Sequence, residues 1–356
     1  MLCVAPLADE RASSRDQQWF MIRRNSDSRR PMANLRKEQL LGKVLDAMRE
    51  GGWLPSVLEG THPYLIQAVH QEHFVFRIRL YIWNCTHGGT NRAADEYRIQ
   101  FTDAPVARWG ELTLVLGWHD EAGVFVGWDV AAHDGRTAYS SSAQVKESTL
   151  QAAHDRAFAM QEKGNEIVVA FQPAFFVDYA LGLTSLHQSV GAYGDQALLN
   201  QLDQVDDTAL AQVRDETRRV VIQQIARRYR ASHFRGTVLS AYGHRCAFCG
   251  IQLGLLDAAH IVPVFSPGSS DEVNNGIALC KTHHHAYDSN LVAFDVDYRI
   301  LVNEPRMTQL WQRGEGGGTQ EFRAALSQYV ILPADPRNYP GRLYIERSLE
   351  VRQWDL

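Results

Sequence analysis

The sequence lacks the features of a membrane-spanning, secreted or strongly basic protein. Its 356 residues contain no run of 18 or more apolar residues, which excludes a transmembrane helix. The first 31 residues carry no basic segment followed by an apolar one, so a secretion signal is not predicted. The 41 acidic and 36 basic side chains give a net charge of −5, so a nucleic-acid site would have to be a local basic surface. We therefore expect a cytoplasmic protein without a membrane partner.

Cysteine is scarce, and its placement is uneven. Five cysteines are present, and three of them, Cys246, Cys249 and Cys280, fall within 35 positions. An odd number of cysteines without a secretion signal argues against a disulfide framework. The cluster favours a metal site in a reducing compartment.

The composition is that of a folded protein of about two domains. Apolar residues make up 45% of the chain and charged residues 22%, which argues against a disordered chain. Residues 1–31 are polar and aperiodic, and we expect them to be disordered or to be a non-native extension before a true start at Met32. Residues 32–195 combine several strand-like runs with few helices, which predicts an N-terminal α+β domain with a mixed or antiparallel sheet. We expect this domain to serve specificity or regulation.

Individual elements of the N-terminal domain are also predicted. A helix opens at Met32, with Asn34 as its cap, and ends at Gly51. Residues 148–164 form one helix, and residues 166–171 form a strand that follows it.

A basic helical linker is predicted over residues 196–235, with one helix running from about residue 206 to Arg230. Eight arginines stand against only Asp215 and Glu216 between positions 214 and 245, so this stretch carries a charge of +6. Such a run is usually a solvated helix face, but it adjoins the cysteine cluster, so phosphate contacts are an equal alternative. The candidate DNA-binding residues are Arg227, Arg228, Arg230, Arg235 and Arg245.

Two pairs of candidate metal ligands share one spacing. Cys246 and Cys249 are separated by two residues, and so are Cys280 and His283, where Cys280 stands 31 positions after Cys249. Three sulfur ligands and one imidazole form a closed tetrahedral zinc site, which stabilises a fold and leaves no open position for catalysis. Three buried free cysteines are the plain alternative, but two matched pairs rarely arise by chance. We therefore predict a structural Zn²⁺ site.

A second group of polar residues lies in the same segment. His260 ends a short apolar strand, and Asn275 lies in the loop that follows. His284 and Asp288 are four positions apart, so on a helix they share one face. A strand, a loop and a helix in this order can bring the four side chains to one point.

The segment from Phe234 to Phe294, about a sixth of the chain, resembles an HNH nuclease of the ββα-metal fold in its zinc-stapled form. The resemblance implies that His260 is the general base and that Asn275 orients it. It also implies that His284 binds a catalytic divalent cation, Mg²⁺ or Mn²⁺.

One position departs from the pattern of this family. Many members carry Asp or His immediately before the base histidine, whereas this chain has Ala259. A subset of the family has an acid two residues earlier and an Asp four residues after the helix histidine, and Asp257 and Asp288 occupy those places. Alternate residues of a strand share a face, so Asp257 lies on the same face as Ala259. The candidate ligands of the catalytic metal are therefore Asp257, His284 and Asp288, although Asp288 could instead be a helix cap or the partner of an arginine.

The fold prediction is α+β, with the N-terminal sheet domain, the helical linker, a ββα-metal HNH module over residues 236–300 and a tail over residues 301–356 that packs on the module. The predicted function is metal-dependent hydrolysis of double-stranded DNA in restriction or phage defence. Target choice by the N-terminal domain is inferred only by analogy. The sequence leaves open whether the chain forms a homodimer.

Three further interpretations stay open. Ala259 favours a nucleic-acid-binding or ligand-sensing protein whose HNH module is structural or inactive. Aromatic residues of the N-terminal domain are usually core, but any that line a pocket could stack a flipped or modified base. Asp129, Gln144 and Lys146 form a weak PD-(D/E)XK-like pattern, which would be a second nuclease site.

Overall fold

The structure is a computed structural model, and it describes residues 34–70, 75–88, 93–134 and 141–354. The expected extension over residues 1–31 and the candidate start at Met32 lie outside these residues. Within the described ranges, no helix has both the length and the apolar character that crossing a membrane requires.

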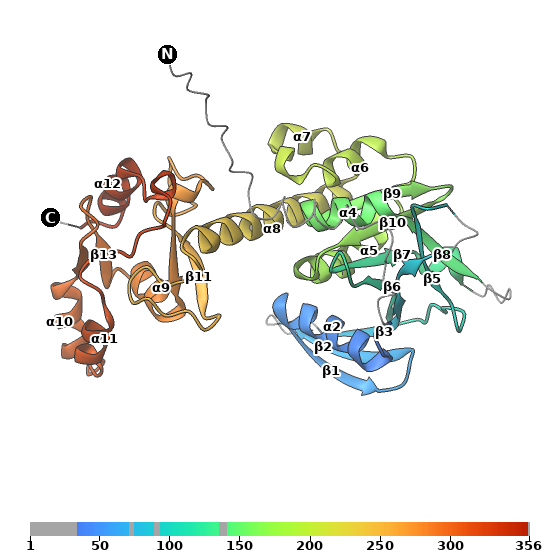
Figure 1. Cartoon of the computed structure of the whole chain (residues 1–356), viewed down its shortest axis with the longest axis horizontal. Coiled ribbons are helices and arrows are strands. Elements are labelled where there is room, and N and C mark those ends of the chain that lie inside the picture. The colour runs from blue at the N-terminus through green and yellow to red at the C-terminus, as the bar shows by residue number, and fades with distance from the viewer. Residues whose placement is uncertain (1–33, 71–74, 89–92, 135–140, 355–356) are drawn as a thin grey trace, which may run out of the picture.

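Two lobes are joined by one long helix, α8 (Glu216–Ala241), which passes from one to the other (Figure 1). Asp215 starts this helix, because its side chain accepts a hydrogen bond from the backbone N–H of Arg218 at 2.8 Å. Helix α8 belongs to both lobes. Its first half buries Ile222 and Ile225 in the N-terminal core, and its second half buries Val238 in the C-terminal core.

A seven-stranded sheet forms the centre of the N-terminal lobe. Its strands are β1 (Trp53–Glu59), β2 (Tyr64–His70), β3 (Val75–Asn84), β6 (Leu112–His119), β7 (Val124–Trp128), β9 (Phe158–Lys163) and β10 (Glu166–Phe171). Their order in the sheet is β1-β2-β3-β6-β7-β10-β9. All neighbours are antiparallel except β3 and β6, which run parallel. The mixed sheet confirms the predicted α+β class.

Other elements pack on part of each face of this sheet, and a separate hydrophobic core lies between the sheet and the elements on each face. On one face pack α2 (Lys37–Glu50), α5 (Phe176–His187) and the first half of α8. On the other pack α4 (Glu147–Arg156) and a small sheet of β4 (Thr86–His87), β5 (Glu96–Gln100) and β8 (Ser142–Lys146). The short elements of this lobe are α3 (Val130–His133), η1 (Pro173–Phe175), α6 (Tyr193–Leu199), η2 (Leu202–Gln204) and α7 (Asp207–Ala211).

Two predicted helices of this lobe are corrected by the structure. The segment 148–164 is a helix only up to Arg156, because Ala157 takes a positive φ of 71° and the chain continues as strand β9. The helix expected from Met32 begins at Lys37 within the described residues, after residues 34–36, which are not helical. Its start is fixed by Gln39, whose Oε1 accepts a hydrogen bond from the backbone N–H of Arg36 at 2.9 Å.

The segment predicted as a linker is part of the N-terminal core. Leu199, Leu202 and Leu210 are buried there. The single helix expected from residue 206 is broken after α7 and resumes as α8, which continues to Ala241. The two lobes therefore share a helix, and no separate linker stands between them.

The C-terminal lobe is built on two short hairpins and a helix. Its elements are β11 (Leu256–His260), η3 (Val273–Asn275), β12 (Gly276–Cys280), α9 (Lys281–Asp288), β13 (Val292–Phe294), β14 (Ile300–Val302), α10 (Glu304–Gln312), α11 (Thr319–Ala325), η4 (Pro336–Asn338) and α12 (Arg342–Val351). Strands β11 and β12 are antiparallel, and α9 follows β12 directly. Residues of the last 50 or so positions, including Val330, Ile345 and Leu349, complete the core around Phe248 and Tyr287.

Candidate active site and metal centre

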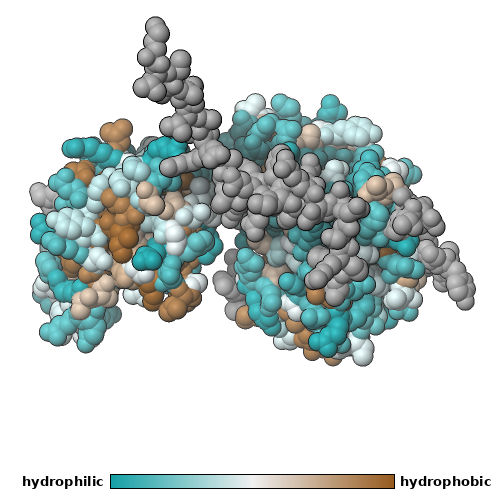
Figure 2. Space-filling view, in the orientation of Figure 1, coloured by the Kyte–Doolittle hydropathy of each residue, from teal (hydrophilic) through white to brown (hydrophobic). Residues whose placement is uncertain are grey.

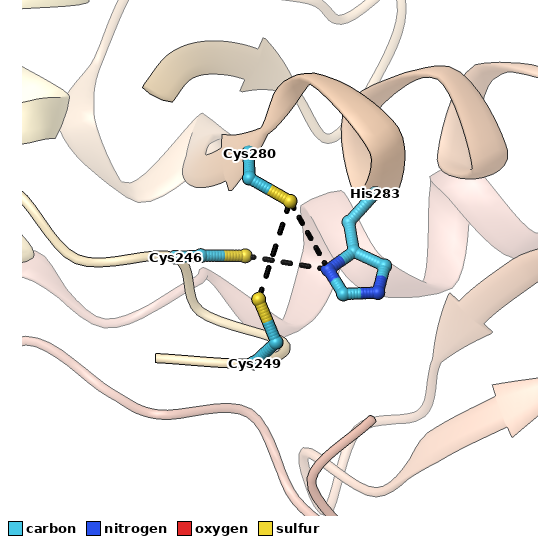
Figure 3. A group of neighbouring side chains, drawn as sticks. All are labelled: Cys246, Cys249, Cys280 and His283. Carbon is cyan, nitrogen blue, oxygen red and sulfur yellow. Dashed lines mark hydrogen bonds between the residues drawn. The ribbon is translucent and has the colours of Figure 1, made fainter. Parts of the chain in front are cut away.

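Three thiols and one imidazole meet in the C-terminal lobe (Figure 3). Nδ1 of His283 lies 3.4 Å from Sγ of Cys280 and 3.6 Å from Sγ of Cys246, and the Sγ atoms of Cys249 and Cys280 are 4.0 Å apart. All four ligand atoms lie within 4.8 Å of one another. A tetrahedral zinc ion with three sulfur ligands and one nitrogen ligand requires separations of about 3.5–3.8 Å. The donor set and its spacing therefore fit such an ion.

Local backbone geometry brings the two halves of this cluster together. Cys246 and Cys249 lie on a tight loop, in which the N–H of Gly250 donates to the carbonyl of Cys246 at 2.8 Å. Gly250 has a φ of +74°, which favours glycine there. Cys280 ends β12 and His283 lies in the first turn of α9, so the strand-to-helix junction aims both side chains at the loop.

The protonation of the cluster is uneven. Burial raises the pKa of the Cys246 thiol, but the hydrogen bond with His283 and nearby backbone N–H groups outweigh this effect and lower that pKa to about 6. Burial raises the pKa of Cys249 to about 12. The surrounding protein thus stabilises the thiolate of Cys246, whereas burial disfavours the thiolate of Cys249 unless a cation lies nearby.

His260 lies about a strand's length from this cluster, at the end of β11. Its side chain is 17% exposed, and its Nε2 lies 2.9 Å from Oδ1 of Asp271. Its ring stacks on Phe234 of α8, with ring centroids 3.8 Å apart and planes 11° apart. A carboxylate and an aromatic face thus fix the imidazole while one edge stays open to solvent.

Asn275 is fully buried, and its side chain holds the loop between β11 and β12. Its Oδ1 accepts from the N–H of Val262 at 2.9 Å, and its Nδ2 donates to the carbonyl of Ser270 at 2.8 Å. Within the described residues, the Asn275 side chain bonds to Val262, Ser269 and Ser270 and not to His260. Asn275 therefore fixes the loop that presents Asp271, and Asp271 contacts the histidine. Sequence reasoning missed Asp271, because an Asp after two serines is an ordinary loop residue.

The three expected ligands of the catalytic metal are neighbours, but they do not surround one point. Oδ2 of Asp257 lies 3.9 Å from Nδ1 of His284, whereas Oδ2 of Asp288 lies 3.3 Å from Nε2 of the same ring. The two carboxylates thus face opposite nitrogens of one imidazole. Asp288 also lies 3.6 Å from the guanidinium of Arg352. The hydrogen bond with His284 outweighs partial burial and lowers the pKa of Asp288.

Asp257 is the most contacted acid of the site. Nζ of Lys281 lies 2.6 Å from its Oδ2, and Nε of Arg235 lies 3.1 Å from its Oδ1. Partial burial alone would raise the pKa of Asp257, but these two cations outweigh it and hold the pKa below its ordinary value. A charged carboxylate and two cationic side chains therefore stand beside His284.

The candidate DNA-binding arginines fall into three groups. Arg228 pairs with Asp178 at 2.9 Å, and Arg230 donates to the carbonyl of Val205 at 2.9 Å, so both bind α8 to the N-terminal lobe. Arg235 lies at the site beside Asp257. Arg227 and Arg245 are exposed, and neither forms an ion pair with any residue that the structure describes.

The weaker N-terminal candidates have structural roles. Asp129 caps α3 by accepting from the N–H of Ala131 at 3.0 Å, and Gln144 binds Lys163. Trp83 lines a pocket of about 230 Å³, but it is only 6% exposed. Lys37 lies 4.8 Å over its ring, so no open ring face is offered to a base.

Comparisons with known proteins identify two regions of the chain. Residues 246–295 match the family model described as HNH endonuclease, and residues 76–180 match the model described as Methylase-associated X1. No curated protein matches the chain. A solved structure titled "Modification dependent TagI restriction endonuclease" is 13% identical, over 78% of this chain and 81% of that chain, with a TM-score of 0.27. That TM-score is too low for the likeness to carry a structural argument.

The HNH match spans the cysteine–histidine cluster, His260, Asn275 and His284, which are the residues that carried the resemblance in the sequence. It confirms the predicted recognition and the predicted enzyme class. The chain therefore carries an HNH endonuclease domain over residues 246–295 and is an enzyme of the nuclease class.

Proposed function

We propose that this protein is a metal-dependent endonuclease that hydrolyses phosphodiester bonds of double-stranded DNA, with His260 as the general base. The observation that carries the proposal is the fixed imidazole of His260 within an HNH domain that also holds carboxylates and cations around His284. Proton abstraction from water requires a neutral imidazole held in one orientation, and the contacts with Asp271 and Phe234 provide that orientation.

Asp271 has a second effect on the reaction. Because Nε2 of His260 contacts the Asp271 carboxylate, Nδ1 is the nitrogen that would take the proton of the attacking water. The carboxylate at 2.9 Å then stabilises the imidazolium that forms. Asn275 supports this pair indirectly, through the loop that it holds.

Asp257 and Nδ1 of His284 are the groups that would hold a divalent cation, because a carboxylate and an imidazole 3.9 Å apart suit Mg²⁺ or Mn²⁺. When bound, such a cation neutralises phosphodiester charge and stabilises the departing 3′ oxygen. Asp288 would orient His284 through Nε2, as carboxylates often do for metal-binding histidines. Lys281 and Arg235 would bind the phosphate next to the cut bond.

The cysteine–histidine cluster would hold a structural Zn²⁺. Its four donors, Cys246, Cys249, Cys280 and His283, leave no open position, so this ion would stabilise the domain and take no part in hydrolysis.

A role in restriction or phage defence is part of the proposal. Support comes from the match of residues 76–180 to a family described as methylase-associated, because a methylase that marks DNA and a nuclease that reads the mark form one system. The N-terminal lobe would then choose the target, and the protein would act in the cytoplasm. Whether it acts as a homodimer stays a prediction.

A second candidate function is a nucleic-acid-binding protein with an inactive HNH domain. Ala259 favours this function, because many family members carry an Asp or His metal ligand at that position. The ion pairs of Asp257 with Lys281 and Arg235 favour it too, because these side chains compete with a cation for the same carboxylate.

Plasmid cleavage separates the two functions. The intact chain is incubated with methylated and unmethylated supercoiled plasmid, with Mg²⁺, with Mn²⁺ or with no added metal. We expect nicked and linear DNA with 5′-phosphate ends only when a cation is added. Binding without cleavage of any plasmid would favour the second function.

A further inference from the structure

One tryptophan of the N-terminal lobe is wholly exposed. Trp109 has a relative exposure of 102%, whereas Trp83, Trp118 and Trp128 of the same lobe are buried. It precedes Gly110, which has a φ of +78°, in a tight turn closed by a hydrogen bond from the N–H of Glu111 to the carbonyl of Arg108. The indole of Trp109 therefore lies in solvent and packs against no other part of the lobe, so its burial contributes nothing to the stability of the fold.

The turn lies at one end of the open part of the large sheet. Ile78 of β3 pairs with Leu112 of β6, so Arg77 lies across from Glu111, next to the turn. On the same face of β3, two residues earlier, Val75 is 58% exposed. Its neighbours across the strands are Val69 and then Leu54, of which Leu54 is 68% exposed.

The small sheet and α4 do not cover this region, so β1, β2 and β3 present an exposed face with an apolar row of Leu54, Val69 and Val75 beside a polar row of Ser56, Gln67 and Arg77. Figure 2 shows hydrophobic groups over β1 and β2 at the lower edge of the N-terminal lobe. The face ends at the Trp109 turn.

The charge around the turn is positive. Glu111 forms a bidentate contact with the buried Arg79, at 2.8 and 2.9 Å, and Glu59 binds the same guanidinium at 2.6 Å. With Arg77 and Arg108, three guanidinium groups therefore stand against two carboxylates. The hydrogen bonding with Arg79 lowers the pKa of Glu111, and the charges of Arg108 and Arg77 act in the same direction, which places both arginines within electrostatic range of it. Both arginines are exposed, and neither forms an ion pair with a residue in the described ranges. An exposed indole flanked by two free guanidinium groups matches the chemistry of a nucleic acid, in which base faces lie between phosphates.

We propose that the Trp109 turn is a DNA contact of the N-terminal lobe, in which the indole inserts at a base step of the duplex and Arg77 and Arg108 bind the flanking phosphates. This inference rests on the proposed function, since it takes double-stranded DNA as the substrate. Inserted apolar side chains unstack a base step and bend the duplex, and the bend brings more DNA against the protein. The exposed face of β1–β3 beside the turn is the surface that would receive it.

The test compares three variants of the intact chain: Trp109→Ala, Trp109→Phe and Trp311→Ala. Trp311 lies in the other lobe and is 61% exposed, so it is the matched control. Binding to a short labelled DNA duplex is measured without added Mg²⁺ or Mn²⁺, so that cleavage plays no part. We expect Trp109→Ala to bind about 5- to 150-fold more weakly, from the loss of one base stack. Trp109→Phe should lose less, and Trp311→Ala should bind as the wild type does.

Two further readouts separate insertion from a general loss of affinity. Acrylamide should quench the fluorescence of Trp109 readily in the free protein and weakly in the DNA complex, with the Trp109→Phe variant identifying its share of the emission. The Arg77→Ala/Arg108→Ala variant should lower the log–log slope of binding against salt by about 1.8, or about 0.9 for each phosphate contact.

Unchanged DNA affinity in Trp109→Ala, with Trp109 equally quenchable in the complex, would overturn the proposal and assign the surface to a protein partner. Plasmid cleavage by the wild type tests the proposed function separately. A protein that cuts plasmid and binds DNA without Trp109 keeps that function and refutes this inference alone.

Discussion

The two polar clusters of the HNH domain are built on the same strands and helix, and they differ in how the fold completes them. The cysteine–histidine cluster is mostly buried, and its four donor atoms converge within 4.8 Å. Around His284, the carboxylates of Asp257 and Asp288 face opposite ring nitrogens, and cationic side chains already neutralise Asp257. The arrangement of the first cluster therefore suits a permanently bound ion. Under the proposed function, the ion pairs of the second group would have to exchange when a phosphodiester binds and leaves.

The largest effect is expected at the first cluster. Cys280→Ser should abolish zinc binding and unfold the C-terminal lobe, because the binding free energy of a structural zinc, about 10–16 kcal/mol in small zinc domains, is also folding free energy. Zinc content by mass spectrometry and thermal unfolding measure the change.

Cys85→Ala is the matched control, since Cys85 is a buried cysteine of the other lobe. It should keep its zinc. A Cys280→Ser protein with one zinc per chain and an unchanged Tm would contradict the assignment.

The next largest effect is expected at His260. His260→Ala should lower the rate of DNA cleavage by about 10²–10⁴-fold, because only proton abstraction from water is lost. Zinc content and DNA affinity should stay unchanged, since His260 contacts neither cluster directly. Exposed His233 of α8 provides the control variant, His233→Ala. Near wild-type cleavage by His260→Ala would move the general base elsewhere.

A smaller and rescuable effect is expected at His284. His284→Ala should raise the concentration of Mn²⁺ needed for cleavage by more than the roughly 10–100-fold that loss of a residue orienting a metal ligand costs, because here the ligand itself is lost. High Mn²⁺ should restore part of the rate, whereas it should not restore His260→Ala. His285→Ala, which changes the exposed neighbour on α9, should behave as the wild type. Equal metal dependence of His284→Ala and the wild type would exclude His284 from the cation site.

The smallest effect is expected at Asp271. Asp271→Asn keeps a hydrogen bond to His260 but removes the charge that stabilises the imidazolium, so cleavage should fall by about 10-fold or more. The cleavage rate at one fixed pH, with zinc content measured beside it, tests this expectation. Cleavage by Asp271→Asn at the wild-type rate would show that the contact is only structural.

The metal ligands could be predicted from the sequence because their spacing is local. Cys246 and Cys249 lie on one tight loop, and Cys280 and His283 lie at one strand-to-helix junction, so a few residues determine each half. Asp271 could not be predicted in this way. Its contact with His260 depends on how Asn275 folds a loop back on the strand, and that geometry is tertiary.

The fold class could be predicted, but two elements could not be placed from pattern alone. The segment after Arg156 has apolar residues that suit a helix or a strand, and pairing with β10 decides for the strand. The arginines of α8 favoured the prediction of a solvated linker. The structure shows that α8 also contributes to two cores, through buried Ile222 in the N-terminal lobe and buried Val238 in the C-terminal lobe. Charge on one face of a helix does not reveal what the other face packs on.

Helix α8 also has a consequence for where the protein cuts DNA. The N-terminal core contacts the helix up to Tyr229, and the C-terminal core contacts it from Phe234 onward, so about one turn separates the lobes. Each residue lengthens a helix by about 1.5 Å and rotates the chain by about 100° around the helix axis. A single residue inserted in this turn would therefore rotate the nuclease lobe by about 100° relative to the N-terminal lobe. Seven inserted residues would return it to nearly the same angle, about 10.5 Å or three base pairs further along. Under the proposed function, the helical phase of α8 would therefore set the distance between the base pairs that the N-terminal lobe contacts and the base pair that is cut.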